Sequence, residues 1–127
     1  MPDQPTYEFD AATAVRPRPD GTSFDIDIDA GFTVGPKPNG GYLLAIAALA
    51  AGEALAAAGA SHPDPLGATA HYLRAPDPGP AEVTTTVLRM GSGASQVRTT
   101  LSQGDRACVD ATFTMGTLAP VGEGVWW

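Results

Sequence analysis

The alternation of hydrophobic and polar residues is strictest between residues 23 and 29. The apolar positions are Phe24, Ile26 and Ile28, and the aspartates between them are Asp25, Asp27 and Asp29. Because successive side chains of a strand point to opposite faces, this pattern predicts a strand with one buried and one solvated face. Asp20-Gly21 predicts a chain reversal just before it, and residues 7–15 are the expected partner strand.

A long run of alanine and leucine predicts a helix over about residues 41–58. Asn39 is placed to cap its first turn, and Gly59 is placed to end it. Apolar residues occupy nearly every face, so the helix belongs either in the core of a fold or in a bilayer. Alanine favours membranes only weakly, Gly52 and Glu53 interrupt the run, and no cluster of Lys or Arg flanks it. We therefore expect a core helix and no membrane span.

The second half of the sequence predicts a series of strands separated by glycine and proline. The predicted strands cover residues 68–73, 81–89, 95–103 and 106–115. In the last strand, the residues expected to face the core are Ala107, Val109, Ala111, Phe113 and Met115. The two-residue link at 104–105 favours a hairpin and hence an antiparallel sheet. One helix of small residues with a sheet wrapped around it is an α+β fold, and this is the fold class that we predict.

Composition narrows the classes of function. The chain has 127 residues, 14 acidic and 7 basic side chains and a net charge of −7, so nucleic acid is not an expected partner. One domain is expected over residues 1–118, with a tail over 119–127. The N-terminus lacks the charged-then-apolar pattern of a secretory signal, and Cys108 is the single cysteine. These features favour a cytoplasmic protein.

No metal site and no cofactor are expected. Aspartates that alternate along one strand face lie about 7 Å apart, and they do not surround an ion. A calcium loop that begins at Asp25 also needs Gly and Glu at the positions that hold Ala30 and Pro36. Cys108 is expected on the polar face of its strand, and a lone thiol is expected to be inert.

Several short motifs follow one another in an order typical of a known family. They are TVG at 33–35, PNGGYLLAIA at 38–47, PDPL at 63–66, HYLRAP at 71–76, LRMG at 88–91, SQVR at 95–98 and ATF at 111–113. With these motifs the chain resembles acyl-CoA thioesterases over about residues 22–116, and more narrowly the N-terminal hotdog domain of the two-hotdog type II enzymes. The resemblance implies a hotdog fold, a sheet wrapped around one long helix, and hydrolysis of acyl-CoA or a similar acyl thioester. Ser92 departs from the family, which often carries Arg at this turn.

The resemblance also implies a site at the glycine turn, which we define as residues 39–41. Gly40 and Gly41 inherit the role of backbone donors to the oxyanion, which suits free N–H groups at a helix N-terminus. Asn39 inherits the role of orienting the substrate, and the alternative is that all three residues merely cap the helix. Thr69 and His71, which share a strand face, are candidates for positioning water. A structural, hydrogen-bonded role is the alternative for His71.

A catalytic carboxylate is missing from residues 46–50, where single-hotdog relatives commonly carry one. Glu53 is the first acid after the glycines, and a rise of about 1.5 Å per residue puts it roughly 18 Å along the axis from Gly41. We therefore expect Glu53 to be solvated or to have a partner at a sheet edge. In two-hotdog thioesterases the water-activating residues lie mainly in the C-terminal hotdog, so a homodimer or a second hotdog domain is the expected partner, and residues 119–127 resemble the start of a connector. The alternative function is a non-catalytic, acyl-binding or structural half that completes a partner hotdog.

Overall fold

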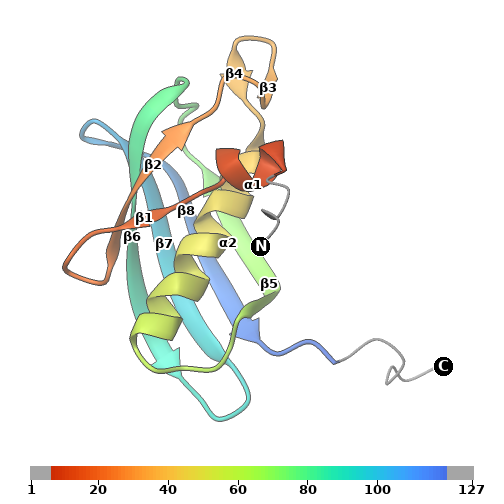
Figure 1. Ribbon diagram of the computed structural model, residues 1–127, viewed down its shortest axis with the longest axis vertical. Helices are drawn as coiled ribbons and strands as arrows, with labels where there is room; N and C mark the ends of the chain where they lie inside the picture. The colour runs from red at the N-terminus through yellow and green to blue at the C-terminus, as the bar shows by residue number, and fades with distance from the viewer. Residues whose placement is uncertain (1–6, 120–127) are drawn as a thin grey trace, which may run out of the picture.

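The computed structural model describes residues 7–119, which form a curled sheet with one long helix against it (Figure 1). The helices are α1 (Glu8–Ala12) and α2 (Gly40–Ala57). The strands are β1 (Arg16–Pro17), β2 (Ser23–Ile28), β3 (Thr33–Val34), β4 (Lys37–Pro38), β5 (Asp64–Tyr72), β6 (Gly79–Met90), β7 (Ser95–Gln103) and β8 (Arg106–Gly116). The expected connector lies almost wholly in residues 120–127, outside the described residues.

Six strands form one antiparallel sheet in the order β1-β2-β6-β7-β8-β5, and β3 and β4 form a separate small hairpin. The predicted α+β class is confirmed, and the predicted strand over 95–103 coincides with β7. β5 follows α2 in the sequence, yet it takes the far edge of the sheet beyond β8. One side of β5 is therefore unpaired within the described chain, which matters for any partner.

The predicted helix is confirmed within one or two residues at each end. Asn39 is the N-cap, Ala58 is the C-cap, and Gly59 follows with a φ of 89° that favours glycine. By length and composition alone α2 could cross a membrane. In the structure, however, small residues such as Ala47 and Ala51 pack one face of α2 onto the sheet, as in a core helix.

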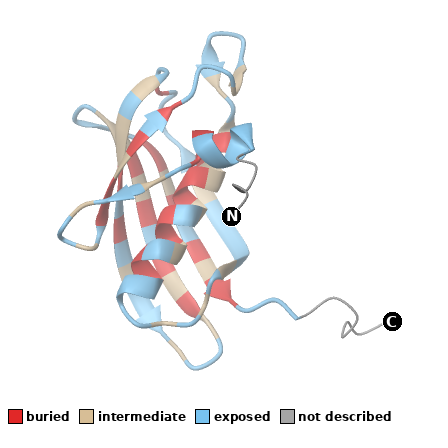
Figure 2. Cartoon of the chain, in the orientation of Figure 1, coloured by how far each residue is buried: buried red, intermediate tan, exposed pale blue. Residues whose placement is uncertain are grey.

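The core lies between α2 and the concave face of the sheet, where the buried residues gather (Figure 2). On the helix the buried residues are Tyr42, Leu43, Ile46, Ala47, Ala50, Ala51, Ala54 and Leu55. The predicted alternation in β2 is confirmed, because Phe24, Ile26 and Ile28 are buried while the aspartates between them are not. Alanine on the helix lets the strands approach closely.

The prediction of a strand over residues 7–15 is wrong, because this segment begins with α1. Thr13 donates from its backbone N–H to the carbonyl of Phe9 at 3.0 Å, as in a helix. The ring of Phe9 then packs edge-on against Phe32, with ring centroids 5.5 Å apart. Tertiary packing of this aromatic ring favours a helical turn, and the partner of β2 is the two-residue β1, which contains Pro17.

Two other expectations need correction. β5 begins at Asp64, four residues before the predicted start, and a proline at position 65 is tolerated because β5 is an edge strand. Cys108 is buried at 1% exposure instead of lying on a polar face, while Ala107 is exposed. A register shift in the pairing of β7 with β8 accounts for this, because Leu101 pairs with Val109 and the next residue pairs with Ala107. Such a bulge turns the extra residue, Cys108, inward.

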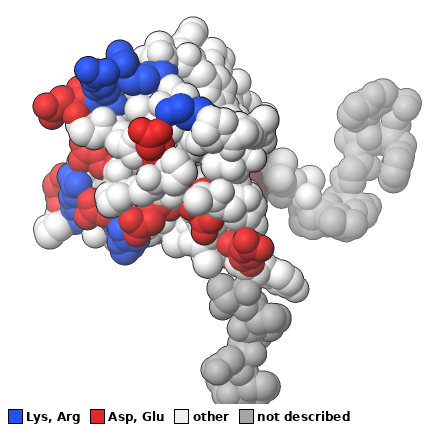
Figure 3. Space-filling model, turned by 90° about the horizontal axis from the view of Figure 1, so that it is seen from above, with Lys and Arg blue, Asp and Glu red and all other residues white. Residues whose placement is uncertain are grey.

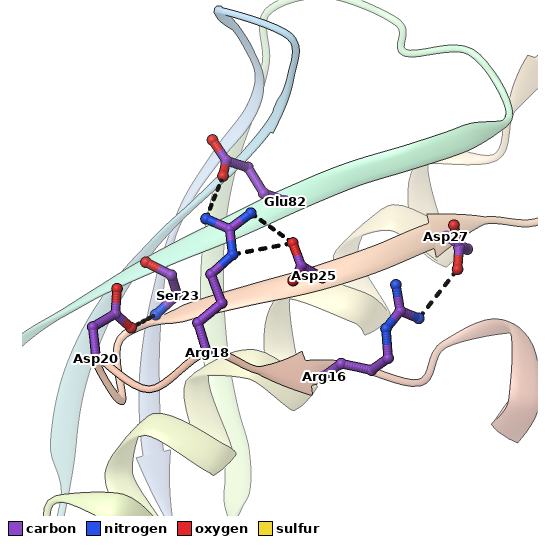
Figure 4. Close-up of polar contacts among 7 residues, drawn as sticks. All are labelled: Arg16, Arg18, Asp20, Ser23, Asp25, Asp27 and Glu82. Carbon is purple, nitrogen blue, oxygen red and sulfur yellow. Dashed lines mark hydrogen bonds and ion pairs between the residues drawn. The ribbon is translucent and has the colours of Figure 1, made fainter.

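Ion pairs on the outer side of the sheet join the two strands of the β1–β2 hairpin, and one of them joins the hairpin to β6 (Figure 4). Arg18 contacts both Asp25 and Glu82, the latter at 2.9 Å, and Arg16 lies 3.1 Å from Asp27. The hydrogen bonds from Arg18 lower the pKa of Asp25. These pairs are partly exposed, so each contributes little by itself, and together they mark the outer face of β2 as structural.

Candidate functional site

The glycine turn at residues 39–41 caps α2. The Oδ1 atom of Asn39 accepts hydrogen bonds from the N–H of Gly41 at 2.8 Å and of Tyr42 at 3.3 Å. The carbonyl of Asn39 accepts from the N–H of Leu43 at 3.1 Å. Among the described residues, the N–H of Gly40 has no acceptor. Of the two expected oxyanion donors, one is therefore engaged by Asn39 and one is unengaged.

Close contacts explain why both positions are glycine. A Cβ atom at Gly40 would lie 3.2 Å from the ring of Tyr72, and one at Gly41 would lie 3.2 Å from Oδ1 of Asn39. Neither glycine has a positive φ, so conformational strain is not the reason. The hydroxyl of Tyr72 donates to the carbonyl of Gly40 at 2.9 Å. Tyr72, at the end of β5, thus fastens the edge strand to the first turn of α2.

An apolar groove of about 350 Å³ runs between α2 and β5, and we call it the α2–β5 groove. Its lining residues are Gly41, Leu44, Ala45, Ala48, Pro65, Leu66, Gly67, Ala68 and Phe113. None of them carries a charge. Gly41 belongs to this lining, so the groove meets the glycine turn at one end. An uncharged groove that ends at backbone N–H groups suits a hydrocarbon chain with a polar carbonyl at its end.

A second hollow, of about 560 Å³, lies on the outward face of α2 and shares Ala45, Ala48 and Pro65 with the α2–β5 groove. Glu53 lines this second hollow and is exposed, as the sequence predicted. Leu49, also in its lining, is 47% exposed. The carboxylate of Glu53 is therefore outside the α2–β5 groove.

Thr69 and His71 are not brought together with the glycine turn. In the pairing of β5 with β8, Thr69 is opposite Thr112 and His71 is opposite Asp110, and both are exposed. Ala111 and Phe113, the β8 residues next to the partners of Thr69 and His71, are buried in the core. Because side chains alternate along a strand, Thr69 and His71 point to the convex side of the sheet, away from α2.

Tyr72 is the polar residue at the glycine turn that sequence reasoning missed. It shares the helix-facing side of β5 with Ala68 and Ala70, whose partners Phe113 and Ala111 are buried. The sequence did contain a signal for this position: Tyr72 is two residues after Ala70 and four after Ala68, so the alternation of side chains along a strand puts all three on one face. Among the described residues, no group of three His, Cys, Asp or Glu side chains is placed to hold a metal ion.

Ser95 is buried at 0% exposure, and its Oγ lies 2.7 Å from Nδ1 of His62. The other ring nitrogen of His62 lies 3.4 Å from the carbonyl of Ser92. A buried hydroxyl that lines none of the hollows described above is not presented to a substrate. We therefore interpret this pair as a tie between β7 and the segment that follows α2.

A curled antiparallel sheet around a central helix is the hotdog fold, and solved thioesterase structures share it. The chain belongs to the family of acyl-CoA thioesterase N-terminal domains, whose model matches residues 28–116. A putative thioesterase II from Thermobifida fusca is 33% identical with a TM-score of 0.82, and the match covers 94% of this chain and 42% of that chain. The predicted fold and family are confirmed.

Two further proteins are similar to the chain, one in sequence and one in fold. The uncharacterized protein Rv0499 of Mycobacterium tuberculosis is 35% identical over 115 residues, which cover 85% of this chain and 40% of that protein. The chain thus spans about 40% of the length of this curated relative. The smu.793 protein of Streptococcus mutans, solved bound to acetyl CoA, shares the fold with a TM-score of 0.67 and 20% identity over 74% of this chain and 77% of that chain.

Proposed function

We propose that this chain is one hotdog half of an acyl thioester hydrolase. The acyl chain lies in the α2–β5 groove and the thioester carbonyl lies over the glycine turn. The observation that carries the proposal is that an uncharged groove meets a helix N-terminus at Gly41, beside the unengaged N–H of Gly40. Membership of the acyl-CoA thioesterase family supports this choice of substrate class.

The reaction adds the oxygen of water to the carbonyl carbon and breaks the carbon–sulfur bond. One proton of the water ends on the sulfur, so the products are a carboxylic acid and a thiol. Negative charge develops on the carbonyl oxygen, and the N–H of Gly40 is available to stabilise it. The N–H of Gly41 becomes a second donor when the carboxamide of Asn39 rotates away from it.

The second hotdog that supplies the group activating water is, in this proposal, another copy of this chain, so the chain is expected to be active by itself. The lining of the α2–β5 groove contains no carboxylate, and Thr69 and His71 face away from the glycine turn of their own chain. β5 offers an unpaired edge for the second hotdog, and the exposed Leu66 lies on the same strand. The cytoplasmic location expected from the sequence stays a prediction.

A non-catalytic role is the second candidate, and one observation favours it. Asn39 engages the N–H of Gly41 within the chain itself, as an ordinary helix cap does. In this case the chain binds acyl groups or completes a partner hotdog without contributing donors to the reaction.

Thiol release from a panel of acyl-CoA substrates separates these candidates. The full 127-residue chain is compared with Gly41→Val and with Gly93→Val, whose added Cβ meets open space. The proposal expects turnover in the parent and in Gly93→Val, and a loss of about a hundredfold in Gly41→Val because the β-branched side chain blocks the carbonyl position. Binding without turnover in the parent supports the non-catalytic role. Full activity of a folded Gly41→Val chain contradicts any role of the glycine turn.

A further inference from the structure

The glycine turn has a hollow on each side. On the side of Gly41 is the α2–β5 groove. On the side of Gly40 is another hollow, of about 400 Å³, which has not been described above. We call it the Arg74 hollow, and its lining residues are Pro38, Gly40, Leu43, Tyr72, Leu73, Arg74 and Ala75. Ala68 in the groove and Tyr72 in the hollow are four residues apart on β5, which is about 13 Å at ~3.3 Å per residue. A ligand centred on the turn therefore reaches both.

Charge distinguishes the two hollows. The groove lining is uncharged, whereas the lining of the Arg74 hollow includes the basic residue Arg74. No acidic residue lines that hollow. A substrate that is apolar at one end and anionic at the other fits this arrangement in one direction only.

Arg74 belongs to the minority of basic side chains without an acidic partner among residues 7–119. Four of the seven are in ion pairs, namely Arg16, Arg18, Lys37 and Arg98. Among residues 7–119, Arg74, Arg89 and Arg106 have no acidic partner within ion-pair distance. Figure 3 shows that acidic and basic groups are interspersed on the face seen there. An arginine without a partner in such a surface is available to an anion from outside.

Arg89 is the natural comparison, because it also lines a small hollow. That hollow lies at the 91–94 turn, next to Ser95, which pairs with Met115 at the end of β8. Tyr72 pairs with Val109 near the other end of the same strand. Six residues of strand separate the two positions on β8, which is about 20 Å. Arg74 and not Arg89 therefore lies within reach of the glycine turn.

We propose that Arg74 binds a phosphate group of the thiol carrier whose acyl thioester occupies the glycine turn. This inference rests on the proposed function, and it adds the direction in which the substrate binds. The acyl chain extends toward Phe113, and the thiol carrier extends past Tyr72 toward Arg74. Coenzyme A is a carrier of this chemistry, with phosphates at the end remote from the sulfur. A guanidinium group binds phosphate through two parallel charge-assisted hydrogen bonds.

The test compares Arg74→Gln with Arg89→Gln in the full 127-residue chain. Two substrates carry the same acyl group, one on coenzyme A and one on the uncharged N-acetylcysteamine. The dissociation constant of a non-hydrolysable thioether analogue of the acyl-CoA is measured by calorimetry alongside kcat/KM. We expect Arg74→Gln to lower affinity and kcat/KM for the CoA forms at least about tenfold, because glutamine lacks the charge and the paired donors of the guanidinium group. With the N-acetylcysteamine substrate, we expect kcat/KM of Arg74→Gln to change less than twofold. In Arg89→Gln, we expect less than a twofold change in kcat/KM for both substrates and in affinity for the analogue.

Each other outcome has a definite meaning. Equal losses on both carriers in Arg74→Gln show a structural role and overturn the proposal, as does an equal loss in Arg89→Gln. Analogue binding without turnover in the parent chain rejects the proposed hydrolysis, and the calorimetric comparison of the two variants still decides the role of Arg74. A parent chain that does not bind the analogue overturns the Arg74 assignment directly.

Discussion

Thr85 and Thr99 lie opposite each other on β6 and β7, both buried, and their hydroxyl groups differ in one respect. The hydroxyl of Thr85 donates to the carbonyl of Thr22 at 2.8 Å. The hydroxyl of Thr99, at 1% residue exposure, has no hydrogen-bond partner among the described residues. A buried hydroxyl without a partner costs free energy that a methyl group of the same shape does not.

Thr99→Val is therefore expected to raise the free energy of unfolding by about 1 kcal/mol, because it removes an unpaired polar atom. Thr85→Val is expected to lower it by about 1 kcal/mol, because it leaves the carbonyl of Thr22 without that donor. Urea unfolding of both variants against the parent measures the two changes. Destabilisation of equal size in both variants would show that the hydroxyl of Thr99 has a partner in solution.

Tyr42→Phe tests the contact that joins α1 and the end of β2 to α2. The hydroxyl of Tyr42 donates to the carbonyl of Ala12 at 2.6 Å and accepts from the N–H of Asp29 at 2.9 Å. Removing it leaves two backbone groups unpaired, so we expect a loss of about 2 kcal/mol in unfolding free energy. Tyr72→Phe removes one exposed hydrogen bond and should cost under about 1 kcal/mol. Equal losses in thermal melts would contradict this ranking.

Asn39→Ala separates capping from catalysis at the glycine turn. The variant should lose about 1 kcal/mol of unfolding free energy because Oδ1 no longer accepts from Gly41 and Tyr42. Asn39→Ser, which retains a capping oxygen, should stay within about 0.5 kcal/mol of the parent. Because both variants leave the N–H of Gly40 unchanged, hydrolysis per folded molecule should persist in both. Loss of hydrolysis in the stable Asn39→Ser variant would instead give Asn39 a direct role with substrate.

Asp110 makes stability depend on pH. Hydrogen bonds from Arg98, at 2.8 and 3.0 Å, hold the pKa of Asp110 below its ordinary value of 3.8. A lowered pKa in the folded state stabilises the protein above about pH 4, and this contribution is lost as pH falls through the folded-state pKa. Asp110→Asn should therefore be less stable than the parent near pH 7, with a gap that closes on acidification. Asp105→Asn, which has no ion-pair partner among the described residues, is the control.

Local patterns predicted the elements that depend on local physics. The alternation around Ile26 and the alanine-rich run beginning near Gly41 each specify a single type of element, and β2 and α2 form as expected. The strand predicted over residues 7–15 was wrong because the packing of Phe9 against Phe32 favours a helix, and the local sequence pattern gives no sign of that contact.

The site residues likewise divide into those whose placement follows from the local sequence and those whose placement depends on distant strands. The capping of α2 by Asn39 follows from residue type and position alone. The face taken by Thr69 and His71 depends on the register of β5 against β8, two strands separated by most of the second half of the chain. The bulge that buries Cys108 likewise arises from pairing with β7. Long-range register is set by the whole sheet, so sequence spacing within one strand could not reveal it.

The dependence of kcat/KM on acyl chain length tests the central claim, that the α2–β5 groove holds the acyl chain. Ala48 lines this groove seven residues beyond Gly41, about 10 Å along the helix at ~1.5 Å per residue. At roughly 1.3 Å per carbon, a chain of about eight carbons reaches Ala48 from the turn. Ala57, exposed at the end of α2, provides the control variant Ala57→Leu.

We expect Ala48→Leu to lower kcat/KM at least about tenfold for acyl groups of about eight carbons or more, while acetyl-CoA changes less than twofold. Ala57→Leu should leave the whole profile unchanged. An Ala48→Leu profile that keeps the parent's shape, or a uniform loss at every chain length, would contradict the placement of the acyl chain in this groove.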